Sequence, residues 1–242
     1  MILYPTTKWV FNLVWCLILG MFPMGALADH GRQTWANAAS SVVIVNPTWP
    51  GYNRPGFGAP PGTAPAGSGV YIAVDGVKPK GLVLTAAHVV YRASSIEIVD
   101  FAGRSADAEI IAIDMRRDLA LLKSPLDGKA ISLRRDTPDV GSHVCALGNS
   151  FGLGVSISCG VVSAVNRTKV KINEIEDFVQ TDAAINPGGS GGALVDADGQ
   201  LVGLVDAIFT KEADIDAGVN FAVSISLIDS WINNLKARGD VF

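Results

Sequence analysis

The sequence predicts an all-β fold that ends in a single α-helix. Short apolar runs rich in valine, isoleucine and leucine recur along the 242 residues, separated by glycine, proline, asparagine and aspartate. This pattern is typical of strands joined by turns. Residues 226–238 differ, because their apolar side chains repeat with the period of an amphipathic helix and Gly239 supplies a helix stop. With 49% hydrophobic and 17% charged residues, the chain is expected to be globular.

Residues 1–28 have the organisation of a secretory signal peptide. Lys8 is the only charge, the apolar stretch 9–22 follows it, and residues 26–28 form an A-x-A cleavage site. A permanent membrane anchor is the alternative, but the apolar stretch is shorter than the roughly 20 residues of a spanning helix. We therefore expect an exported protein, periplasmic or secreted, that begins near Asp29.

Residues 46–69 are rich in proline, glycine and asparagine. Proline removes a donor from a β-ladder, so we expect a long surface loop here rather than a central strand. Too few residues precede this segment for it to be a linker between domains. Its aromatic residues Trp49, Tyr52 and Phe57 either cover a functional site, contact a partner, or pin the loop to the strands beneath it.

The remaining apolar runs are expected to be strands. In the first half, Asp75 and Gly76 supply a turn between two of them. The expected strands are 41–45, 70–74, 81–85, 95–99, 108–113 and 119–122 in the first half, then 144–148, 155–162, 177–182, 201–205 and 218–223.

One serine lies among four glycines, in the segment Gly188-Gly189-Ser190-Gly191-Gly192. Glycine allows close backbone approach and positive φ, but it costs conformational entropy. The arrangement suits a hydroxyl nucleophile whose neighbouring N–H groups face a developing oxyanion. The alternative is a glycine-rich turn with an incidental serine.

Two further motifs favour the nucleophile. His88 follows an apolar run, and Asp118 opens another; Asp114 is a rival carboxylate, but its surroundings suggest an exposed turn where it is solvated or paired with arginine. The G-x-S-x-G pattern also fits the nucleophile elbow of α/β-hydrolases, which requires a histidine after the serine. His30, His88 and His143 all precede Ser190, so that fold is excluded.

The order His88, Asp118, Ser190 and the motifs TAAHVV (85–90), DLALLK (118–123), GNSFG (148–152) and TDAAINPGGSGGAL (181–194) resemble the chymotrypsin-like serine proteases, most closely the bacterial HtrA/Deg branch. The resemblance runs from about Ser41 to about Trp231. It implies that residues 29–242 form a trypsin-like serine protease domain of two six-stranded antiparallel Greek-key β-barrels. The first barrel would span about 38–130, the second about 131–225, and the C-terminal helix about 226–238. Larger members carry a PDZ domain after the protease, for which no room is expected here.

The resemblance also implies the chemistry. Ser190 would be the nucleophile, His88 the general base and Asp118 the residue that orients the imidazole. The N–H groups of Gly188 and Ser190 would form the oxyanion hole, and no metal or cofactor would be needed. Pro187 restricts the same loop, although the sequence does not indicate whether it favours an active or a latent conformation.

In this family the specificity pocket is lined by residues just before the serine and by a later strand. The corresponding residues here are Ala184, Ile185, Leu204 and Val205. Because no carboxylate stands at the base of the pocket, we expect an apolar residue before the cleaved bond rather than lysine or arginine. Asp206 follows Val205 directly, but the sequence does not indicate whether its side chain points toward the pocket.

Cys145 and Cys159 fall on two predicted strands around a turn centred on Gly152, which places them opposite each other. Export permits oxidation, so a Cys145–Cys159 disulfide is expected. Two buried thiols, or a metal site that includes His143, are the alternatives.

The formal net charge is −4 and the sequence has no basic patch, so nucleic acid is not an expected partner. Protein or peptide substrates are expected instead. Family members often trimerise through N-terminal aromatic residues, for which Trp35 is the only candidate before the first strand. The alternative function is a secreted binding or chaperone-like module on an inactive or latent protease fold.

Overall fold

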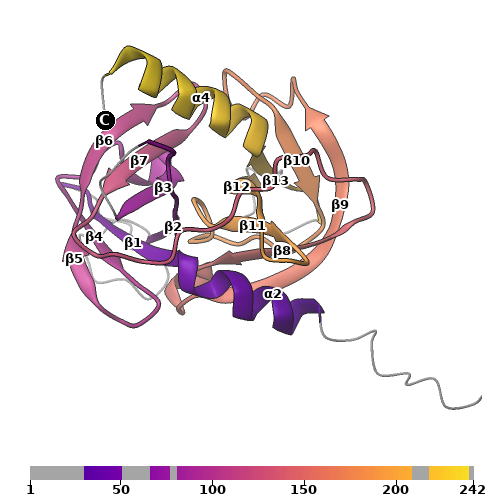
Figure 1. Cartoon of the computed structure of the whole chain (residues 1–242), viewed down its shortest axis with the longest axis horizontal. Coiled ribbons are helices and arrows are strands. Elements are labelled where there is room, and N and C mark those ends of the chain that lie inside the picture. Colours follow the sequence, from indigo (N-terminus) through magenta and orange to yellow (C-terminus); the bar gives the residue numbers. More distant parts are fainter. Residues whose placement is uncertain (1–29, 51–65, 77–80, 209–217, 240–242) are drawn as a thin grey trace, which may run out of the picture. The chain divides into compact units, whose positions relative to one another are not determined.

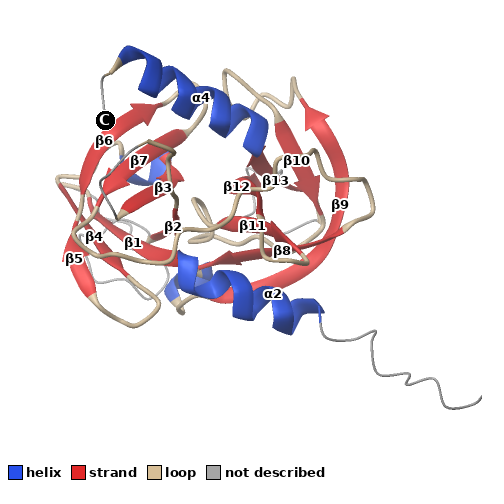
Figure 2. Ribbon diagram, viewed as in Figure 1, coloured by secondary structure: helices blue, strands red, loops and turns tan. Residues whose placement is uncertain are grey.

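The computed structural model describes residues 30–50, 66–76, 81–208 and 218–239. The predicted signal peptide and residues 51–65 of the predicted loop lie outside these ranges, so they are not discussed further. Gly31–Phe242 is one compact unit, built mainly of strands (Figures 1 and 2). No helix in the described ranges is long and apolar enough to cross a membrane.

The first half of this unit is a seven-stranded antiparallel sheet with the order β5-β4-β1-β2-β3-β7-β6. The prediction of an all-β first half is confirmed, but the sheet has one strand more than the six expected. The extra strand, β5, is three residues long and too short to stand out in the sequence. The strands are β1 (Val42–Thr48), β2 (Gly67–Tyr71), β3 (Leu82–Ala86), β4 (Ser95–Val99), β5 (Ser105–Asp107), β6 (Glu109–Asp114) and β7 (Leu119–Lys123).

Both ends of the predicted loop 46–69 belong to strands. β1 continues through Pro47 to Thr48, and β2 already begins at Gly67. Pro47 is tolerated because β1 pairs with β2 only over residues 42–45, whereas Pro47 pairs with β4 alone. On the side of β1 that faces β2, no hydrogen bond to Pro47 is needed, so the missing N–H is tolerated there.

The second half is a closed antiparallel barrel of six strands, as predicted, with the order β10-β13-β12-β11-β8-β9. Its strand β11 directly follows the glycine-rich segment and was not recognised in the sequence. The strands are β8 (His143–Gly148), β9 (Ser156–Arg167), β10 (Phe178–Thr181), β11 (Ala193–Asp196), β12 (Leu201–Ile208) and β13 (Asn220–Ser224).

The predicted C-terminal helix is α4 (Ile225–Arg238), which packs against β12 and β13 (Figure 1). The Ser224 hydroxyl accepts from the Leu227 N–H, and Gly239 ends the helix with φ 68°. An N-terminal helix, α2 (His30–Ala38), was not predicted; its Trp35 ring contacts Phe101 edge-to-face at 5.8 Å. The shorter helices are η1 (Ala39–Ser41), α3 (Ala87–Val90) and η2 (Ser150–Gly152).

The largest apolar cluster joins the two halves. Leu84 and Leu121 of the first sheet belong to the same cluster as Leu147 and Leu204 of the barrel, and all four are at most 1% exposed. Burying each such leucine contributes about 1.5–3 kcal/mol. This shared core fixes the loops of one half against those of the other, which is where the candidate site lies.

Candidate active site

His88 and Asp118 adjoin two neighbouring strands: His88 lies in α3, directly after β3, and Asp118 lies directly before β7. β3 and β7 pair with Ala86 opposite Leu119, so His88 and Asp118 lie just beyond the paired ends. The Asp118 Oδ2 accepts from His88 Nδ1 at 2.5 Å, and Oδ1 accepts from the His88 backbone N–H at 2.7 Å. One carboxylate therefore fixes both the backbone and the ring of the histidine.

The backbone of Asp118 supports this arrangement. Its φ of 56° lies in the left-handed region, which aspartate tolerates better than most residues. In this conformation its carbonyl accepts from the Ala87 N–H at 3.1 Å. The Asp118 side chain is 6% exposed, whereas that of His88 is 46% exposed. The carboxylate is thus shielded while the imidazole remains accessible to a substrate.

The pKa of His88 is raised from its ordinary value. Burial lowers this pKa, but the hydrogen bond to Asp118 and the negative charge of Asp118 are the main opposing effects. The imidazolium is therefore stabilised, as a general base requires. The rival carboxylate, Asp114, instead pairs with Arg117 at 2.6 Å and accepts from the Arg116 N–H.

The loop before Ser190 forms a β-turn over residues 186–189. The Gly189 N–H donates to the Asn186 carbonyl at 2.9 Å, and Gly188 has φ 93°. Proline at the second position and glycine with positive φ at the third indicate a type II turn. The Pro187 carbonyl accepts from the Phe151 N–H at 2.6 Å. Because a trans peptide directs its C=O and N–H to opposite sides, the Gly188 N–H points away from Phe151.

Ser68 of β2 links the turn to the rest of the protein. Its hydroxyl donates to the Gly188 carbonyl at 2.7 Å and accepts from the Asn149 N–H at 2.8 Å. Its backbone N–H donates to the Ser190 carbonyl at 2.9 Å. Within the described ranges, the amides of Gly188 and Ser190 have no hydrogen-bond acceptor. These are the two amides predicted for an oxyanion hole.

Asp206 connects the two parts of the site. The Ser190 hydroxyl donates to the Asp206 carbonyl at 3.1 Å. The side chains of Asp206, Asp118 and His88 each place one polar atom within 4.8 Å of the others. Asp206 therefore faces the histidine and aspartate, a direction that the sequence did not indicate.

A cavity of about 270 Å³ lies beside the serine loop, and none of the described residues that line it is charged. Ala184, Ile185 and Val205 line it as predicted residues of the pocket, but Leu204 does not. Leu204 is fully buried in the shared core, because successive side chains of a strand point to opposite faces. The other lining residues are Ala146, Leu147, Gly148, Ser150, Ser156, Ile157, Ser158, Asn186 and Gly189.

The family model of the trypsin-like peptidase domain matches residues 67–204. The chain belongs to the trypsin-like peptidase family. A curated relative, the periplasmic serine endoprotease DegP of Salmonella typhimurium, is 39% identical over 178 residues, which are 72% of this chain and 36% of DegP. The pH-dependent periplasmic serine endoprotease DegQ of Escherichia coli is 36% identical over 72% of this chain and 38% of DegQ. The chain thus spans little more than a third of these relatives.

Solved structures agree with this assignment. The HtrA-type protease AlgW with a tripeptide has a TM-score of 0.75 and 34% identity, over 86% of this chain and 64% of AlgW. The serine endoprotease from Yersinia pestis has a TM-score of 0.68 and 32% identity, over 88% of this chain and 68% of that one. The fold of this trypsin-like peptidase is therefore that of the HtrA-type proteases, as the sequence predicted.

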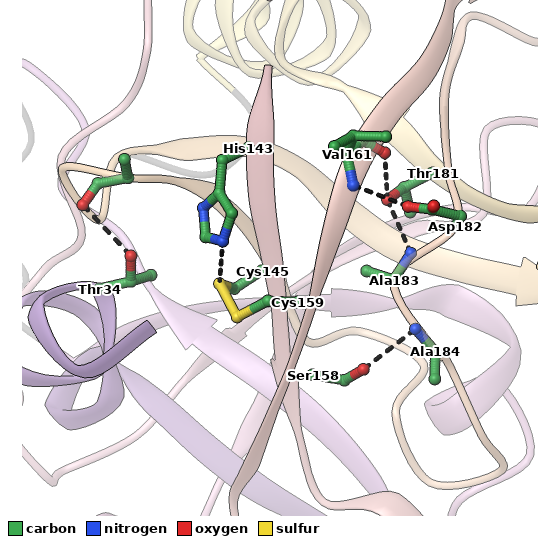
Figure 3. Close-up of a disulfide and its surroundings, with 11 residues drawn as sticks. Thr34, His143, Cys145, Ser158, Cys159, Val161, Thr181, Asp182, Ala183 and Ala184 are labelled. Atoms are coloured by element: carbon green, nitrogen blue, oxygen red, sulfur yellow. Dashed lines mark hydrogen bonds between the residues drawn. A yellow bond between two sulfur atoms is a disulfide. The ribbon is translucent and has the colours of Figure 1, made fainter. Parts of the chain in front are cut away.

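One wall of the pocket in this trypsin-like peptidase is tied to a disulfide (Figure 3). Cys145 of β8 and Cys159 of β9 are direct cross-strand partners, and their sulfur atoms are bonded. Next to Cys159, the Ser158 hydroxyl accepts from the Ala184 N–H at 3.0 Å. His143 Nε2 lies 3.9 Å from the Cys145 sulfur, but sulfurs bonded to each other are not the thiolates that a metal site needs.

Sequence reasoning missed several residues of the site. Ser68 lies in the segment predicted to be loop, and Asn149 and Phe151 were noticed only as part of a turn that resembles the family. Asn173 donates to Asp206 at 2.6 Å, and nothing in its local sequence marks it. These residues act through long-range contacts, which no local pattern reveals.

Proposed function

We propose that this trypsin-like peptidase is an exported serine endopeptidase that cleaves proteins or peptides with a Ser190–His88–Asp118 triad. The observation that carries the proposal is the double hydrogen bond from His88 to the buried Asp118 carboxylate. Asp206, which lies beside both side chains, also accepts from the Ser190 hydroxyl through its carbonyl. The names of the relatives, periplasmic serine endoproteases, support the same reaction and the same compartment.

The first step would begin with rotation of the Ser190 hydroxyl from the Asp206 carbonyl toward His88. The oxygen attacks the peptide carbonyl carbon while His88 accepts the proton, and Asp118 stabilises the imidazolium. The amides of Gly188 and Ser190 donate to the oxyanion of the tetrahedral intermediate. As the C–N bond breaks, His88 returns the proton to the leaving amine.

The second step hydrolyses the acyl-enzyme. His88 removes a proton from water, the hydroxide attacks the ester carbon, and the proton returns to Ser190 as the acid leaves. The residue before the cleaved bond would occupy the 270 Å³ cavity. Because the described lining residues are uncharged, a medium-sized apolar side chain is preferred over lysine or arginine.

Cleavage of unfolded casein by the purified protein tests this proposal. We expect fragments from the wild type and from Ser105→Ala, an exposed serine of β5, but none from Ser190→Ala. Sequencing of the fragments should place apolar residues before the cut. Cleavage by Ser190→Ala would contradict the triad, and cuts after lysine or arginine would contradict the assigned pocket.

The alternative is a binding or chaperone-like module. In the structure the Ser190 hydroxyl donates to Asp206 rather than to His88, as in a resting site. If the wild type leaves casein intact but suppresses aggregation of an unfolded protein as well as Ser190→Ala does, the binding module is the correct function.

A further inference from the structure

We propose that Asp206 is a fourth, positioning residue of the site, whose protonated carboxyl donates a hydrogen bond to the Asp118 carboxylate. Its main-chain carbonyl at the same time holds the resting Ser190 hydroxyl. This inference rests on the proposed triad and adds a residue to it.

A β-bulge aims Asp206 at the site. Val205 of β12 pairs with Ala222 of β13, and Ala207 pairs with the next residue of β13, Phe221. One residue of β12 between these two pairs therefore has no partner on β13. The additional residue of β12 is Asp206. Bulges commonly redirect a side chain next to an active site. Here the redirected carboxyl is 4% exposed.

The carboxyl of Asp206 accepts a hydrogen bond from a neutral side chain, that of Asn173. Asn173 Nδ2 donates to Asp206 Oδ2 at 2.6 Å. Asn173 is held in turn by Glu176, whose carboxylate accepts from the Asn173 and Ile172 N–H groups. With Oδ2 occupied by an amide, the other oxygen is the one available to Asp118.

The surroundings place the shared proton on Asp206 rather than on Asp118. Both oxygens of Asp118 already accept N–H groups of His88, so Asp206 is the carboxyl left to supply a proton between the two. The titratable groups that face Asp206 are Asp118, from the turn directly before β7, and His88, from α3. Burial raises the pKa of Asp206 well above its usual range, and the negative charge of Asp118 raises it further; His88 and Asn173 only partly oppose this.

A protonated Asp206 has two consequences for the histidine. Its O–H fixes the orientation of the Asp118 carboxylate, which in turn orients the imidazole. It also leaves a single negative charge beside His88. An ionised Asp206 would add a second charge and hold the catalytic proton on His88 more tightly.

Two substitutions separate the hydrogen bond from the charge. Asp206→Asn keeps an oxygen for Asn173 and offers an NH₂ donor to Asp118, whereas Asp206→Ala offers neither. We expect kcat/KM of Asp206→Asn to stay within about 3-fold of the wild type and that of Asp206→Ala to fall about 10-fold or more, mainly in kcat, for one lost hydrogen bond to a charged group. Asp196→Asn, another buried aspartate of the barrel, is the control for general destabilisation. Equal activity of Asp206→Ala and Asp206→Asn would overturn the proposal.

Titration of His88 by NMR provides a readout that a merely structural role would not affect. In a Ser190→Ala background, which prevents self-cleavage, we expect Asp206→Asn to change the pKa of His88 by less than about half a unit, with His143 as the internal reference. A charged neighbour at this distance shifts a pKa by about 1–3 units. A larger fall of the His88 pKa in Asp206→Asn would therefore overturn the proposal. This titration needs no turnover, so its result is distinct from a failure of the casein assay.

Discussion

The two halves of the site are built in different ways. His88 follows β3 and Asp118 precedes β7, two adjacent strands of the first sheet, and their mutual position follows from a single strand register. The Ser190 loop, which belongs to the barrel, depends instead on Ser68 of β2 in the first sheet and on Asn149 and Phe151 in the turn after β8. The acid–base half is therefore locally determined, whereas the nucleophile half needs the two sheets to be packed together.

The largest loss of kcat is expected in the acid–base half of the site, which consists of His88 and Asp118. Asp118→Asn keeps the shape of the side chain but favours the wrong imidazole tautomer, so kcat should fall by about 10⁴. Steady-state kinetics on a peptide substrate measure this loss. Asp114→Asn is the matched control, because Asp114 is the last residue of the preceding strand β6 and pairs with Arg117; it should retain wild-type kcat. Similar losses in both variants would show that the wrong carboxylate has been assigned.

The next largest loss of kcat is expected at the β-turn over residues 186–189, which carries the Gly188 amide. A Cβ at Gly188 would lie 2.3 Å from the Asn149 carbonyl oxygen, at φ 93°. Gly188→Ala must therefore displace the turn and its amide, and loss of one oxyanion donor costs about 10²–10³ in kcat. Gly141→Ala is the control, because Gly141 has φ 88° but no atom within 4 Å of its Cβ position. Both variants carry similar backbone strain, so an equal loss of kcat would contradict the role of the turn.

A smaller effect is expected where the two halves meet. Ser68→Ala removes the hydroxyl between Gly188 and Asn149 and leaves a buried N–H unpaired, at a cost of about 1–3 kcal/mol. We expect kcat to fall about 10-fold, with KM little changed. Ser41→Ala serves as control, because the Ser41 hydroxyl is buried without a hydrogen-bond partner. If Ser68→Ala retained the wild-type kcat, the Ser190 loop would keep its conformation without the Ser68 hydroxyl, which would contradict the role given to Ser68.

This difference also explains how far the sequence could predict the structure. His88, Asp118 and Ser190 could be proposed from the sequence because each adjoins a short motif next to an apolar run. Leu204 was assigned to the pocket from the family resemblance, but its side chain lies in the core. Which face of a strand a side chain occupies depends on the register, and only strand pairing determines that register. The direction of Asp206 follows from a bulge in β12, and Ser68 lies in a glycine-rich stretch that resembled a loop.

The central claim is that His88 activates Ser190. The most direct test is the rate at which a fluorophosphonate labels Ser190, measured as a function of pH. We expect a single labelled serine and a rate that rises as His88 loses its proton. Because the pKa of His88 is raised, the midpoint should lie above the ordinary histidine value of about 6.5. Labelling should be lost in His88→Ala. A rate that is unaffected by His88→Ala, or a wild type that is not labelled at Ser190, would contradict the account.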